Sequence, residues 1–193
     1  MKSIAVFCAS KIGEDSIYHK VASEVGRMLA EENIRLIYGG GKVGLMGAVA
    51  DAALEAGGEV IGVIPYFLDK KEVGHQGLTE LIRVESMHER KMKMSELSEG
   101  VITLAGGFGT LEELTEMLTW SQLALHHKPI GILNTNGYYD YMEKLFDHMC
   151  EEGFLAKETR KIAIFEREPE HLFNKMRSFV PEHLTQHLDR DKT

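Results

Sequence analysis

The sequence has little of what marks secreted or membrane-spanning proteins. Its cysteines are Cys8 and Cys150, too few for a disulfide framework, so both are expected to be reduced core thiols. No apolar run approaches the roughly 18 residues of a membrane span. The start of the chain, MKSIAVFCAS, lacks the longer apolar stretch and cleavage site of a signal peptide. These absences predict a cytoplasmic protein without a membrane partner.

Positive charge is also scarce. The chain carries 30 aspartates and glutamates against 22 lysines and arginines, which gives a net charge of −8. Duplex nucleic acid attracts basic surfaces, so nucleic acid is not expected as a partner. A small phosphorylated ligand stays compatible with this charge, because converging backbone N–H groups can oppose it locally. The nine histidines are scattered, with the pair His183 and His187 in the tail, so no metal site is expected.

The chain alternates strand-length apolar runs with amphipathic segments of helix length. Such alternation predicts an α/β fold, a Rossmann-like three-layer α/β/α sandwich around a mostly parallel sheet. Residues 1–180 are expected to form a single domain and residues 181–193 a polar tail, and residues 66–80 are the longest candidate loop. Ligands bind such sheets at the carboxyl ends of the strands. The apolar runs lie at 4–10, 34–40, 59–65, 81–86, 100–107, 128–134 and 160–165.

Three of the loops that follow these runs are informative: CASKIG, YGGGKVGLMG and AGGFGT. The second contains GGGKVG (39–44), which matches the dinucleotide pattern G-x-G-x-x-G only formally. It follows the second strand instead of the first, and the nearest acid begins a strand, which disfavours an NAD-dependent enzyme. Two interpretations stay open: close packing of a helix on the sheet, or backbone donors that face a ligand or a neighbouring subunit.

The loop AGGFGT (105–110) is a better candidate for anion binding. Gly106, Gly107 and Gly109 can adopt positive φ and let N–H groups converge. Thr110 is predicted to cap the helix that follows, whose positive dipole end would face the loop. Glu113 is ambiguous, because T-x-x-E is also a capping box in which the glutamate only satisfies the helix end.

A helical wheel separates the residues after this loop. Leu111, Leu114, Leu118 and Leu125 form one apolar stripe, the expected core face. Glu113 shares a second stripe with Met117 and Trp120, and a second apolar stripe predicts a partner subunit or a lid. Glu112 falls on a more polar face.

A related anomaly lies in MHERKMKM (87–94), where Arg90 falls on the apolar face of a predicted helix. An inward arginine needs a carboxylate or phosphate partner, because an unpaired buried charge is costly. Arg90 is therefore predicted to meet Glu113, a ligand phosphate, or both. The alternative is that its side chain passes its apolar neighbours and reaches solvent.

These motifs resemble those of a known family. MHERKMKM is similar to the M-x-x-R-K-x-x-M element, and AGGFGTLEE to the P-G-G-x-G-T-x-x-E element, of the LOG ("lonely guy") family of cytokinin riboside 5′-monophosphate phosphoribohydrolases. The resemblance covers roughly residues 3–165. Ala105 replaces the usual proline, which removes a φ restraint but no donor or charge, so the site is expected to survive. Such chains have also been labelled lysine decarboxylases, but no residue here suggests a pyridoxal-phosphate lysine, and no cofactor is expected.

The resemblance implies hydrolysis of the N-glycosidic bond of a nucleoside 5′-monophosphate, and usually a homodimer. It makes Glu113 and Arg90 the catalytic pair, with Glu113 on the ribose and water and Arg90 orienting Glu113 and easing charge on the departing base. Rival functions are a broader purine or pyrimidine nucleotide nucleosidase and a non-catalytic nucleotide-binding protein, which would need neither residue of the pair. The implied substrate contacts are Gly107, Phe108, Gly109 and Thr110 for the phosphate, and Glu72, Lys91, Leu111, Glu112 and Thr119.

Overall fold

The computed structural model describes residues 1–72 and 74–181, without the side chains of residues 70–72. The strands are β1 (Ser3–Phe7), β2 (Arg35–Tyr38), β3 (Val60–Pro65), β4 (Glu80–Val84), β5 (Gly100–Thr103), β6 (Ile130–Leu133) and β7 (Ala163–Glu166). The helices are α1 (Ser16–Glu31), α2 (Gly44–Glu55), α3 (Tyr66–Glu72), α4 (Met87–Leu97), α5 (Phe108–Gln122), α6 (Asp140–Glu151), α7 (Lys157–Arg160) and α8 (Pro169–Arg177), and a short 3₁₀ helix, η1, spans Thr135–Gly137.

The strands form one sheet in the order β4-β3-β2-β1-β5-β6-β7, and every neighbouring pair is parallel. The seven predicted strands and the α/β fold are confirmed. The chain winds outward from β1 to β4 and then returns to place β5 on the other side of β1. Loops that leave β1 and β5 therefore diverge above the carboxyl ends of two adjacent strands, where open α/β sheets bind ligands.

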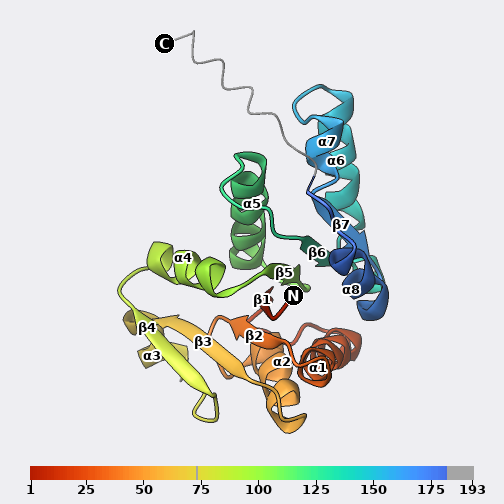
Figure 1. Ribbon diagram of the computed structural model, residues 1–193. Coiled ribbons are helices and arrows are strands. Elements are labelled where there is room, and N and C mark those ends of the chain that lie inside the picture. Colours follow the sequence, from red (N-terminus) through yellow and green to blue (C-terminus); the bar gives the residue numbers. More distant parts are fainter. Residues whose placement is uncertain (73, 182–193) are drawn as a thin grey trace.

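Helices cover both faces of this sheet (Figure 1), with α1, α2 and α8 on one face and α4, α5 and α6 on the other. Successive side chains of a strand point to opposite faces, so each central strand feeds both cores. Ile4 and Val6 of β1 pack with the first set of helices, and Ala5 and Phe7 with the second. The predicted three-layer sandwich is confirmed. No helix among the described residues is long and apolar enough to cross a bilayer.

Residues 66–80 are not simply a loop, contrary to the sequence-based expectation. Tyr66–Glu72 form α3 directly after Pro65, whose fixed φ is compatible with a helix start. Gly74 then pairs with Gly41 in an antiparallel bridge, which ties this segment to the loop after β2. Gly74 and Gly77 suggested an irregular segment, but a seven-residue helix precedes them. The proposed tail boundary cannot be compared, because residues 182–193 lie outside the described part.

Candidate active site

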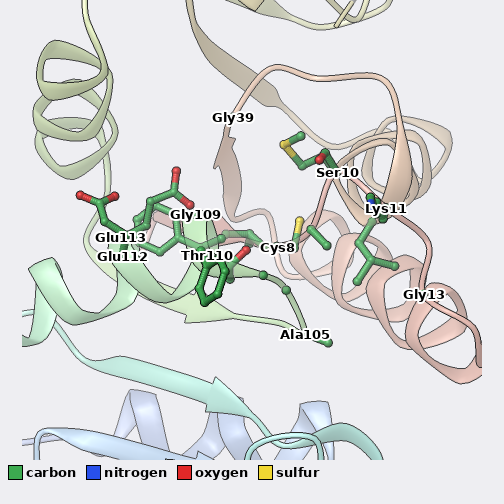
Figure 2. Close-up of a pocket in the computed structure, with 18 of the residues that line it drawn as sticks. Cys8, Ser10, Lys11, Gly13, Gly39, Ala105, Gly109, Thr110, Glu112 and Glu113 are labelled. Carbon is green, nitrogen blue, oxygen red and sulfur yellow. The ribbon is translucent and has the colours of Figure 1, made fainter.

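A cleft of about 550 Å³ lies where the β1 and β5 loops diverge. Its volume falls within the range of small-molecule sites. Its walls come from the loops after β1 and β5, the end of β2, and the helices α4 and α5. Figure 2 shows Glu112 and Glu113 at one end of the cleft and Lys11 at the other, with Cys8 between them.

Arg90 enters this cleft from α4, which begins after Ser86 caps it by accepting a hydrogen bond from the Glu89 N–H at 3.1 Å. The Arg90 side chain is buried, with the residue only 7% exposed. Its Nε donates to the carbonyl of Val63, and its Nη2 to the carbonyl of Gly39, each at 3.1 Å. Arg90 therefore points inward as predicted and does not extend to solvent. A carbonyl within β3 and another just after β2 thus hold two edges of its guanidinium.

The third side of the guanidinium faces Glu113, with Arg90 Nη1 3.7 Å from Glu113 Oε1. Glu113 is 8% exposed. Burial raises the pKa of this carboxyl to about 7, because desolvation outweighs the favourable charge of Arg90, and neighbouring Glu112 adds repulsion. A carboxyl with this pKa exists in both protonation states near neutral pH, as groups that handle protons require.

The capping box is absent from the structure, so that alternative for Glu113 is wrong. Helix α5 begins at Phe108, with Gly107 as an N-cap that offers no side-chain hydrogen bond. Thr110 lies inside the first turn, so its predicted role as N-cap is also wrong. The helix starts early because Gly106 lets the backbone approach Thr110 closely: a Cβ atom at Gly106 would lie 2.1 Å from Thr110 Oγ1.

The backbone donors at the start of α5 face open space. The first N–H of this helix with a helical acceptor is that of Leu111, bonded to the Gly107 carbonyl at 3.0 Å. Within the described chain no acceptor serves the N–H groups of Phe108, Gly109 and Thr110, the usual condition at a helix start. A Cβ atom at Gly107 or Gly109 would meet nothing within 4 Å. The result is a set of uncovered donors at a helix N-terminus, a geometry that suits an anion.

The mechanism predicted for the glycines of this loop is wrong. None of Gly106, Gly107 and Gly109 is among the described residues with positive φ. The donors converge because the helix begins at Phe108, and the glycines serve by keeping side chains out of the space.

Comparison with known proteins identifies the family. A family profile described as "Possible lysine decarboxylase" matches residues 46–176. The cytokinin riboside 5′-monophosphate phosphoribohydrolase LOG of Oryza sativa subsp. japonica is 43% identical over 182 residues, which cover 94% of this chain and 75% of that protein. The enzyme LOG1 of Arabidopsis thaliana is 42% identical over 182 residues, covering 94% and 85%. The chain belongs to the LOG family.

Solved structures with the same fold include a molybdenum cofactor binding protein from Rippkaea orientalis, with a TM-score of 0.70 and 22% identity over 92% of this chain and 97% of that one. The Moco carrier protein of Chlamydomonas reinhardtii has a TM-score of 0.70 and 21% identity, covering 91% and 95%. At these identities the likeness concerns the fold alone. The LOG-family fold is thus shared with proteins that are named for a different ligand.

Of the LOG-family positions predicted to contact substrate, the structure gathers Arg90, Glu113, Glu112 and the loop 107–110 around the cleft. Lys91 is buried but does not line it. Its Nζ pairs with Glu112 and, at 3.0 Å, with Glu116 Oε2. It therefore restrains the carboxylate that borders the cleft.

Two further predicted contacts, Leu111 and Thr119, do not line the described cleft. Leu111 packs, partly buried, against the core on the α4–α6 side of the sheet. Thr119 donates its hydroxyl to the Thr115 carbonyl at 2.7 Å and borders a separate groove between α5 and α6. Glu72 ends α3, but its side chain is outside the described residues. The pair His183 and His187 is outside them as well.

The second apolar stripe of α5 is explained differently from the prediction. Met117 is buried beside Leu114, and Trp120 packs partly buried against the same core. Helix α5 buries the arc between the two predicted stripes, so Met117 and Trp120 contact their own chain. Met117 is thus unavailable to a partner or lid, whereas for the partly exposed Trp120 the contact stays a prediction. Leu125 lies beyond the helix and is largely exposed, so it does not belong to the core face.

Sequence reasoning missed several residues of the cleft. Lys11 is exposed and forms no ion pair within the described chain, and its position in the loop after the first strand was the available signal. Tyr138 donates its hydroxyl to the Gly106 carbonyl at 2.7 Å from a distant segment, which no local pattern reveals. Cys8 lines the cleft together with Arg90 and Glu113, and burial raises the pKa of its thiol, so it is a poor nucleophile. No group of three or more potential metal ligands occurs in the described part.

Proposed function

We propose that this chain hydrolyses the N-glycosidic bond of a nucleoside 5′-monophosphate, either a cytokinin riboside 5′-monophosphate or AMP, to the free base and ribose 5-phosphate. The observation that carries the proposal is the buried pair of Glu113 and Arg90 beside the uncovered N-terminus of α5. A nucleotide has a phosphate that suits the helix end and, a few ångströms away, a sugar carbon that suits a carboxylate. The names of the relatives support the same reaction.

In this reaction the bond between C1′ and the base nitrogen breaks, and its electron pair leaves with the base. Positive charge develops on the sugar ring, and the ionised Glu113 stabilises it. A water molecule supplies the hydroxyl that bonds to C1′, and Glu113 accepts the proton that this water loses and later releases it to solvent. The departing nitrogen takes one proton from solvent, so the two transfers balance. The products are the free base and ribose 5-phosphate, with one water consumed.

Arg90 is the positioning partner of Glu113 in this scheme. Two of its donors are occupied by the carbonyls of Gly39 and Val63, which leaves Nη1 toward Glu113. The charge of Arg90 lowers the pKa of a carboxyl that burial otherwise raises, so it keeps a useful fraction of Glu113 ionised. The same Nη1 group also stabilises the negative charge that develops on the departing base.

The 5′-phosphate lies at the N–H groups of Phe108, Gly109 and Thr110, and Lys11 provides a cation in the same cleft. The net charge of −8 makes such local compensation necessary. A cleft with a binding loop alone would serve a non-catalytic nucleotide-binding protein equally well. The buried carboxyl of Glu113 favours turnover, because burying an acid that has no chemical task costs stability.

The test is to incubate the protein with AMP and with N6-isopentenyl-AMP and to measure free base by chromatography. Release of base from the N6-modified nucleotide at higher kcat/KM identifies a cytokinin-activating enzyme, and preference for AMP and other ordinary nucleotides identifies the broader nucleosidase. Binding of both nucleotides without release of base from either would overturn the hydrolase and leave the non-catalytic alternative.

We propose further that the protein is a cytoplasmic homodimer. The support is the apolar groove between α5 and α6, bordered by Leu118, Phe146 and Leu155, with exposed Phe154 nearby. The two free cysteines suit a reducing compartment. The molar mass from light scattering, measured as the protein elutes from a size-exclusion column at micromolar concentration, distinguishes a dimer from a monomer. A monomeric mass would exclude the dimer. The replacement Leu118→Asp should shift a dimer toward monomers.

A further inference from the structure

We propose that the Tyr138 hydroxyl positions the phosphate-binding loop, so that Tyr138 determines affinity for the phosphate end of the substrate. The inference rests on the proposed function and extends it to a residue from a different part of the chain. Tyr138 precedes α6 and lines the cleft. Its hydroxyl donates to the Gly106 carbonyl at 2.7 Å, immediately before the uncovered donors of α5.

The geometry of the peptide unit gives this bond its consequence. In a planar trans peptide the carbonyl oxygen and the following N–H point in opposite directions. Holding the Gly106 oxygen on the Tyr138 hydroxyl therefore fixes the N–H of Gly107 on the other side of the same plane. A freely rotating peptide could turn the Gly106 oxygen toward the bound phosphate, where two negative groups repel. The hydrogen bond prevents that rotation.

The loop needs such a restraint because its own sequence supplies little. Gly106 and Gly107 have the widest backbone freedom of any residues. Ala105 stands where the LOG family usually has a proline, so no ring fixes φ before the glycines. External bonds replace that restraint. The Ala105 carbonyl accepts from the Ala9 N–H at 3.2 Å, and the Leu104 carbonyl accepts from the Tyr139 hydroxyl at 2.8 Å.

The Tyr138 ring is itself held firmly. It packs edge-on against Tyr18, with ring centroids 5.7 Å apart, and against Tyr139 at 4.9 Å. The following backbone is fixed because the Tyr139 N–H donates to Asn134 Oδ1 at 2.7 Å. These ring contacts do not depend on the hydroxyl. Replacing Tyr138 by phenylalanine therefore removes the bond to Gly106 and keeps the packing.

Tyr139 provides a matched control. Its hydroxyl makes the same kind of bond, to Leu104, but its side chain is buried and away from the cleft. Leu104 precedes the glycines and is held by β-type pairing as well, since its N–H donates to the Phe7 carbonyl at 2.9 Å. The replacement Tyr139→Phe should lower stability without a selective effect on phosphate binding.

The experiment measures product inhibition of nucleotide hydrolysis by ribose 5-phosphate and by adenine, which probe the two ends of the site. Tyr138→Phe should raise the inhibition constant of ribose 5-phosphate and the KM for AMP about three- to tenfold, the range for one lost hydrogen bond. The constant for adenine and kcat should stay near the wild-type values. Tyr139→Phe should lower the melting temperature and leave the ratio of the two constants unchanged.

Adding Ala105→Pro to Tyr138→Phe should restore part of the affinity, because the ring supplies the missing restraint and the Ala105 N–H has no acceptor in the described chain. If Tyr138→Phe leaves the inhibition constants of ribose 5-phosphate and adenine unchanged, or raises both by the same factor, Tyr138 does not position the loop. That failure differs from a failure of the proposed function, in which the wild-type protein itself releases no base.

Discussion

We expect the ionised carboxylate of Glu113 to lower the free energy of unfolding, although the proposed turnover depends on this residue. The folded chain raises the pKa of this carboxyl from 4.5 to about 7, so the folded state retains a proton that the unfolded state releases near pH 4.5. Between these values the folded state binds more protons, and the free energy of unfolding falls as the pH rises. Above pH 7 the full cost is present, roughly 3 kcal/mol for a change of this size.

Replacing Glu113 by glutamine removes that cost while keeping the shape of the side chain. Arg90 keeps its two carbonyl acceptors in the variant. Urea unfolding at pH 8 should show Glu113→Gln to be more stable than the wild type, with an upper limit of roughly 3 kcal/mol. Near pH 5 the two proteins should differ by less than about 1 kcal/mol, because Glu113 is then protonated in the folded wild type.

The same variant should lose turnover by about 10²- to 10⁴-fold, the usual contribution of a positioned acid or base. Glu24→Gln, an exposed change on α1, is the control for both measurements. If Glu113→Gln has the same pH dependence of stability as the wild type, burial does not hold the proton on Glu113. If its turnover is close to that of the wild type, Glu113 is not catalytic.

Three further predictions concern other residues that line the cleft. Arg90→Gln should move the acidic limb of the pH–rate profile upward by about one to three pH units, from the loss of a charge 3.7 Å away. Arg83→Gln, which breaks an ion pair with Asp69 away from the cleft, should leave the profile in place, and equal profiles for both variants would contradict the assignment. Lys11→Ala should raise KM for the nucleotide about fivefold at low salt, and added salt should shrink the effect. The exposed Lys20→Ala is its control, and an equal effect would show a response to net charge alone. Gly109→Ala should stabilise the protein by about 0.5–1 kcal/mol, because alanine favours a helix, while nucleotide binding weakens about tenfold or more. Retained affinity in a titration would show that Gly109 does not face the phosphate.

The fold could be predicted from the sequence because its determinants are local and repeated. Each apolar run has strand length, and each is separated from the next by a segment with helical periodicity, which together require a covered parallel sheet. The inward orientation of Arg90 was predictable for the same reason, since three or four neighbours on a helical wheel define a face. The acceptors of Arg90 were not, because Gly39 follows β2 and Val63 lies in β3, both far from Arg90 in the sequence.

The errors have a common physical origin. The T-x-x-E pattern and the second stripe of α5 were both interpreted within a single helix. The actual helix start depends on how closely Gly106 approaches Thr110, and the buried arc depends on how α5 rests on the sheet. Tertiary packing overrides a local capping signal when the two disagree. Tyr138 shows the same limit, since nothing near the glycine loop in the sequence indicates the hydroxyl that holds it.

The two glycine loops illustrate how the structure separates packing from binding. A Cβ atom at Gly39 would lie 1.9 Å from Arg90 Nη2, and one at Gly44 would lie 2.2 Å from the Ser10 backbone. Gly44 in addition has a φ of +66°, which side chains rarely adopt. These glycines are required by the chain itself, as the packing interpretation of GGGKVG expects. At Gly107 and Gly109 a Cβ would meet nothing, and neither has positive φ. Under the proposed function, glycine at these two positions leaves room for the substrate phosphate to approach the uncovered N–H groups.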